Sequence, residues 1–103
     1  MTLLDLERFE EAKKLLRRTI PVAQRVLGEG NSMTLKMRSL YADALHLDPD
    51  ATVNDVRESV TMLEDTARIA RRVLGRAHPL TVQIIMNSLQ RARAALRARE
   101  ANS

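Results

Sequence analysis

A four-residue segment of this chain occurs twice, and its surroundings repeat with it. Arg25–Gly28, which reads RVLG, recurs as Arg72–Gly75 at an offset of 47 residues. Self-similarity at one fixed period indicates a repeat architecture, in which each unit buries its apolar face against its neighbours. At the same offset, identical residues pair Leu16 with Leu63, Thr19 with Thr66, Ala23 with Ala70 and Thr34 with Thr81. The 103 residues are enough for one domain, at 1–103.

Apolar residues recur every three or four positions, which is the period of an amphipathic α-helix. Glycine and proline interrupt this pattern at Gly28, Pro49 and Gly75. The pattern therefore predicts four helices, at about 4–27, 32–46, 53–74 and 79–101.

Residues at the helix ends support these boundaries. A left-handed cap after a helix favours a residue without Cβ, as at Gly28 and Gly75. Asn31, Thr52 and His78 are the predicted N-caps, the second as part of a capping box. Pro21 predicts a kink within the first helix, because proline removes a backbone N–H.

Short connections place consecutive helices antiparallel, because the chain has no length for a crossover. The predicted fold is therefore all-α, built from antiparallel αα-hairpins. The chain has only two aromatic residues and three glycines, and this low content argues against barrels and sandwiches. The absence of cysteine excludes disulfides and zinc–thiolate sites.

The residues that enzymes use are not arranged for catalysis. His46 and His78 lie 32 residues apart, and no glycine-rich phosphate loop follows a strand. We predict no enzyme activity, no cofactor and no metal site. No apolar run reaches the length of a membrane span and the first residues lack a signal-peptide layout, so we expect a cytoplasmic protein without membrane contact.

Positive charge gathers in the second half of the chain. Residues 61–103 hold eight arginines and three acids, a balance of +5 against −1 for residues 1–60. Such asymmetry can attract nucleic acid or an anionic surface, and it most often marks a solvated helix face. Nucleic acid is the less favoured partner, because stacking aromatics are confined to Phe9 and Tyr41 on apolar stripes. The arginines of the predicted last helix are Arg91, Arg93, Arg97 and Arg99.

The repeated segments resemble the tetratricopeptide repeats of the kinesin-light-chain type. The resemblance lies in Glu7–Ala12 (ERFEEA), Leu15–Ile20 (LLRRTI) and Arg72–Val82 (RVLGRAHPLTV). It implies a short right-handed solenoid of four helices, with about half a repeat at 1–30, one full repeat at 31–77 and a half repeat or capping helix at 78–103. The period of 47 is longer than this family's repeat, and the excess falls at Leu47–Asn54.

The resemblance also implies a function. The first helix of each repeat lines a concave groove that binds extended peptides in this family, so we expect a protein-interaction module for a protein or peptide ligand. Of the family's two hallmark asparagine positions, only one carries asparagine here. The inward positions fall on Lys36, Ser39, Asp43 and His46, then on Gln83, Asn87, Gln90 and Arg93.

The half repeats leave apolar stripes at both ends of the chain. We expect these stripes to pair two copies as a homodimer, with Leu47–Asn54 as a hinge if a helix is exchanged. Self-association is thus an alternative function, and a cap formed by the arginine-rich tail is the opposing interpretation. The stripes are Phe9, Leu16, Ile20 and Leu27, then Val82, Ile85, Met86 and Leu89.

Overall fold

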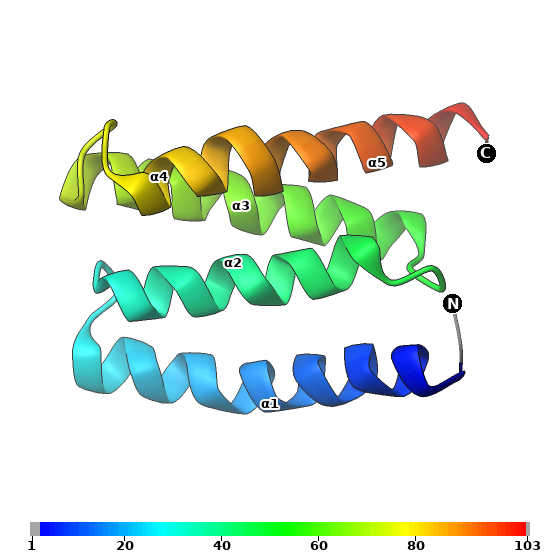
Figure 1. Cartoon of the computed structure of the whole chain (residues 1–103), viewed down its shortest axis with the longest axis horizontal. Helices are drawn as coiled ribbons and strands as arrows, with labels where there is room; N and C mark the ends of the chain where they lie inside the picture. The colour runs from blue at the N-terminus through cyan, green and yellow to red at the C-terminus, as the bar shows by residue number, and fades with distance from the viewer. Residues whose placement is uncertain (1–2, 103) are drawn as a thin grey trace.

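The computed structural model describes the backbone of residues 3–102 and the side chains of residues 7–102. The described residues form helices and short connections. The helices are α1 (Leu3–Leu27), α2 (Ser32–Leu47), α3 (Val53–Val73), α4 (Pro79–Gln83), the π-helix η1 (Ile84–Leu89) and α5 (Gln90–Ala101). The last three follow one another without a break and form one rod. Figure 1 shows α1, α2, α3 and the last rod running side by side in alternating directions. The predicted all-α fold of stacked antiparallel helices is confirmed.

The predicted helix ends are confirmed. Asn31 accepts a hydrogen bond from the Met33 backbone N–H, at 2.9 Å, and starts α2. Thr52 and Asp55 form the predicted capping box at the start of α3. His78 caps α4 by accepting from the backbone N–H of Leu80, at 3.1 Å. The helix α1 continues through Pro21 as far as Leu27.

The two glycines that follow α1 and α3 both have the left-handed conformation that was predicted. The φ angle is +96° at Gly28 and +94° at Gly75. An L-residue is strained at such an angle.

Replacing Gly75 with valine is expected to lower the free energy of unfolding by about 1–3 kcal/mol, because a β-branched residue is forced into positive φ. No atom lies within 4 Å of the added Cβ, so backbone strain rather than a clash causes the loss. Urea unfolding followed by circular dichroism measures it. Gly75→Asn is the control and should cost less, since asparagine tolerates this region better. Equal losses for both variants would contradict the interpretation.

The core lies along α3, which is enclosed by α2 on one side and by the last rod on the other. Leu35 from α2, Leu63 from α3 and Ile84 from η1 are fully buried there. Small hydroxyl residues let the helices approach closely. Ser59 donates to the backbone carbonyl of Ala42, at 2.8 Å, and so joins α3 directly to α2.

The last rod differs from the single regular helix that was expected. In η1 the hydrogen bonds run from i to i+5, so one turn contains an additional residue. Val82 and Met86, two residues of the apolar stripe expected to lack cover, are exposed, whereas Leu89 of the same stripe is buried. Ile84 takes the central buried position instead, with Leu89 beside it.

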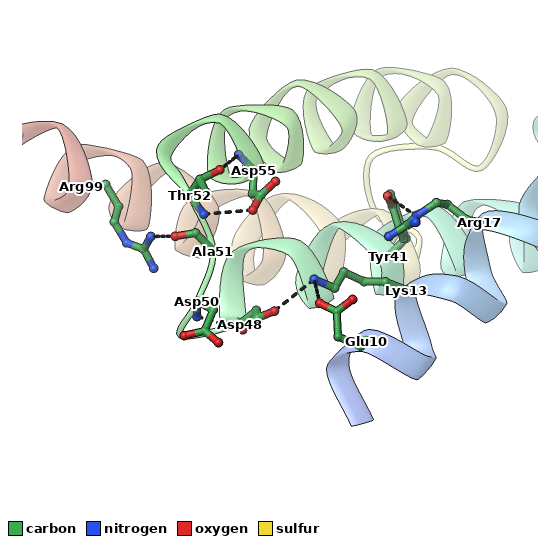
Figure 2. A network of polar contacts seen from close by, with 10 residues as sticks. All are labelled: Glu10, Lys13, Arg17, Tyr41, Asp48, Asp50, Ala51, Thr52, Asp55 and Arg99. Carbon is green, nitrogen blue, oxygen red and sulfur yellow. Dashed lines mark hydrogen bonds and ion pairs between the residues drawn. The ribbon is translucent and has the colours of Figure 1, made fainter. Parts of the chain in front are cut away.

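The connection between α2 and α3 is held by side chains from both ends of the chain (Figure 2). Lys13 of α1 binds the Asp48 carboxylate at 3.0 Å, and both side chains are buried. Arg99 of α5 donates to the backbone carbonyl of Ala51. Asp48 also accepts from the backbone N–H of Asp50, at 2.9 Å. The segment expected to serve as a free hinge is therefore fixed by contacts.

The Lys13–Asp48 pair shifts the pKa of both groups toward the charged form. Burial disfavours the charged carboxylate, but hydrogen bonds from Asp50 and Lys13 outweigh it and lower the pKa of Asp48. Burial likewise disfavours the ammonium, but hydrogen bonds to Glu10 and Asp48 raise the pKa of Lys13. Both groups are therefore charged at neutral pH.

Candidate functional site

A groove runs between the first turns of α2 and α4. Its volume is about 380 Å³. Both sides of the groove start at a capped helix end, because Asn31 and His78 fix where α2 and α4 begin. We call it the α2–α4 groove, lined by Ser32, Met33, Lys36, His78, Pro79, Leu80 and Gln83.

Two of the predicted site residues, Lys36 and Gln83, meet in this groove from different helices. Both are exposed. Their neighbours Met33, Pro79 and Leu80 supply apolar surface. The groove can therefore receive an apolar side chain while Lys36 donates to an acidic or carbonyl group.

Three further predicted residues lie together between α2 and η1. Asp43 joins His46 at 3.2 Å through Nε2 and accepts from the hydroxyl of Ser88 at 3.2 Å. The hydroxyls of Ser39 and Ser88 are 3.5 Å apart. Ser39, His46 and Ser88 are buried, so this network joins α2 to η1 rather than facing solvent. Sequence reasoning did not identify Ser88.

The remaining predicted residues, Asn87, Gln90 and Arg93, are exposed on η1 and α5. Arg93 pairs with Glu64 of α3 at 3.1 Å, so its guanidinium lies on the α3 side of the last rod. The additional residue in the π-turn rotates later positions relative to the simple offset of 47. The groove residues Met33, His78 and Leu80 were missed, although the predicted caps mark where they lie.

Several arginines are occupied within the fold. Arg38 of α2 donates to Asp65 of α3 at 2.7 Å, and Arg68 pairs with the same carboxylate. The hydrogen bond from Arg38 is the main cause that lowers the pKa of Asp65. In the arginine-rich α5, Arg93 and Arg99 both have internal partners. This helix therefore presents fewer arginines to a ligand than its sequence suggests.

A second groove, of about 460 Å³, lies between α1 and α2. Its lining is mostly apolar, and Leu40 and Leu47 are among the exposed large aliphatic residues. We call it the α1–α2 groove, lined by Arg8, Phe9, Ala12, Leu40, Asp43, Ala44 and Leu47.

In the described part of the chain, no three side chains of histidine, cysteine, aspartate or glutamate gather as a metal site would require. No helix within residues 3–102 has the length and apolar character to cross a membrane.

The helices stack in antiparallel pairs, and a left-handed glycine follows α1 and again follows α3. This arrangement is that of a helical-repeat protein. Comparison with known families matches the chain to the tetratricopeptide repeat over residues 1–31 and 51–80, together more than half of its length. The chain belongs to the tetratricopeptide repeat family. Repeats of this family generally mediate protein–protein interaction and are typically scaffolds rather than enzymes. No curated protein and no solved structure matches the chain.

Proposed function

We propose that this chain is an interaction module that binds an extended segment of a partner protein through the α2–α4 groove. The observation that carries the proposal is the convergence of Lys36 and Gln83, from two helices, beside the apolar surface of Met33 and Leu80. A peptide groove needs both features, because apolar contact supplies affinity and a few polar groups fix orientation.

The chemistry of the groove favours a particular partner segment. Lys36 is the charged group among the lining residues, while His78 uses Nδ1 for its own cap. The preferred segment therefore carries an acidic side chain close to an aliphatic one. We infer that the repeats are of the kinesin-light-chain type, with the division into half, full and half repeats given above. A cytoplasmic location stays a prediction.

This function is tested with short synthetic peptides of acidic–aliphatic sequence, and with peptides in which lysine replaces the acid. Titration followed by NMR should shift the amide signals of Lys36 and Gln83 with the acidic peptides alone. Lys36→Glu should weaken binding at least tenfold, because one charge-assisted hydrogen bond contributes about 1.5–3 kcal/mol.

Lys14→Glu is the matched control, since Lys14 is an exposed lysine of α1 outside the groove. It carries the same charge change and should leave binding as it is. Equal losses in the two variants would show that net charge alone drives binding and would refute the groove. Binding of an oligonucleotide with a steep salt dependence would favour the arginine-rich helix instead.

A further inference from the structure

The two halves of the chain repeat in structure as they do in sequence. Thr34 donates to the Ala23 carbonyl and Thr81 donates to the Ala70 carbonyl, both at 3.4 Å. Each partner of the first bond lies 47 residues before its counterpart in the second. Hence α1 is equivalent to α3, and α2 is equivalent to the start of the last rod.

One side of α3 is closed by α2. The buried contacts there include the Ser59 hydroxyl on the Ala42 carbonyl and the ion pair between Arg38 and Asp65. Ile69, on α3, is 4% exposed. A helix equivalent to α3 is therefore expected to have a helix equivalent to α2 packed on this side.

The equivalent side of α1 is open. Val22 stands at the position of Ile69 and is 45% exposed, and Leu15 at the position of Met62 is 57% exposed. The α1–α2 groove extends this surface through Ala12. We call Ala12, Leu15 and Val22 the open face of α1.

Within residues 3–102, the last rod likewise lacks a helix on the side that, in α2, packs against α3. Val82 stands at the position of Leu35, which is fully buried, yet Val82 is 43% exposed. Ile85 stands at the position of Arg38 and is only half-buried. We call Val82 and Ile85 the open face of the last rod. Among the described residues, no segment of the chain closes either face.

We propose that copies of this chain stack end to end, with the open face of the last rod of one copy against the open face of α1 of the next. The contact follows the packing of α2 on α3 within one chain. Such a contact joins two different surfaces, so each added copy leaves both kinds of face available at the ends.

A second copy is the occupant favoured by the chain's own packing. At the offset of 47, Ala12 corresponds to Ser59 of α3 and Ile85 corresponds to Arg38 of α2. Ser59 and Arg38 both bond across the contact between α2 and α3, so one chain supplies both partners.

Within one chain, Arg38 of α2 pairs with Asp65 of α3. At the offset of 47, Ile85 replaces Arg38 and Arg18 replaces Asp65. In the stacked contact Ile85 would therefore lie against Arg18, whose aliphatic stem can pack on it. Exposed aliphatic patches of this kind mark association sites.

This inference goes beyond the proposed function and is independent of it. Neither open face contains Lys36 or Gln83, which line the α2–α4 groove. A chain that stacks without binding peptide, or binds peptide without stacking, separates the two proposals.

Sedimentation equilibrium of the 103-residue chain, from low micromolar to several hundred micromolar, tests the stacking. The weight-average mass should rise above 11.6 kDa with concentration and continue past the mass of two chains. A constant mass of one chain at every concentration overturns the proposal. A mass that stops at two chains indicates two-fold pairing and overturns it as well.

Two variants give a sharper test, because each blocks one face. Val22→Glu removes the open face of α1, and Val82→Glu removes that of the last rod. Each variant alone should be monomeric. Their equimolar mixture should form one-to-one dimers, because each retains the face that the other lacks. A mixture that stays monomeric overturns the proposal.

Both positions are exposed, and thermal melts by circular dichroism verify that the variants are folded. Lys36→Glu is the control, because Lys36 is exposed and lies outside both open faces, and this variant should associate like the unmodified chain. If only one of the two face variants reduced association, the contact would be between like faces and not end to end.

Discussion

Replacing Leu63 with alanine is expected to lower the free energy of unfolding by about 2–5 kcal/mol, because the substitution leaves a cavity in the centre of the core. Leu63 is fully buried where α3 meets its neighbours. A domain of this size has a total stability of about 5–15 kcal/mol, so the loss is a large part of it. Urea unfolding followed by circular dichroism measures the difference.

The internal repeat supplies a matched control for this experiment. Leu16 is the equivalent residue on α1 and is only partly buried. Leu16→Ala removes the same atoms and should cost clearly less at concentrations where the chain is monomeric. Equal costs at the two positions would show that α1 is covered as fully as α3, against the exposure described above.

Replacing Asp48 with alanine is expected to cost about 3 kcal/mol at neutral pH, because it leaves Lys13 buried without its buried partner. Glu10 still contacts the Lys13 ammonium at 2.8 Å. The loss of unfolding free energy is therefore at the lower end of the range for a broken buried ion pair. Asp50→Ala in the same connection is the control. Its side chain is exposed, and we expect a change within about 0.5 kcal/mol.

The pH dependence of this loss follows from the lowered pKa of Asp48. A carboxylate with a lowered pKa stabilises the fold above its unfolded pKa, here 3.8, and loses that effect as the pH falls through the folded value. The stabilities of the unmodified chain and Asp48→Ala should therefore differ at pH 7 and converge in strong acid. A difference that is constant with pH would assign the effect of Asp48 to packing instead of charge.

Local chemistry explains why the helix ends could be predicted from the sequence. Asn31, Thr52 and His78 bond to backbone groups two or three residues away, so no knowledge of the fold is needed. The same holds for Gly75, where the requirement is a property of the backbone itself. The short connections then predicted that consecutive helices are antiparallel, and the internal repeat predicted that they stack as repeats.

The features that the sequence did not reveal depend on partners far along the chain. Lys13 pairs with Glu10 one turn away, but its buried partner Asp48 lies beyond the end of α2, 35 residues along the chain. Arg93 was assigned to the groove on the assumption of a regular helix, and the π-turn before it directs the side chain toward Glu64. Nothing in the residues Ile84–Leu89 alone predicts that turn.

The connection between α2 and α3 also affects how the chain loses its structure. Repeat arrays are generally held by contacts between neighbours, so their end units can melt independently. Here Lys13 and Arg99, from the first and last helices, both bind the connection at Asp48 and Ala51. Opening this connection releases both ends at once. The chain should accordingly unfold as one cooperative unit, without a partly melted form in which only α1 or α5 is lost.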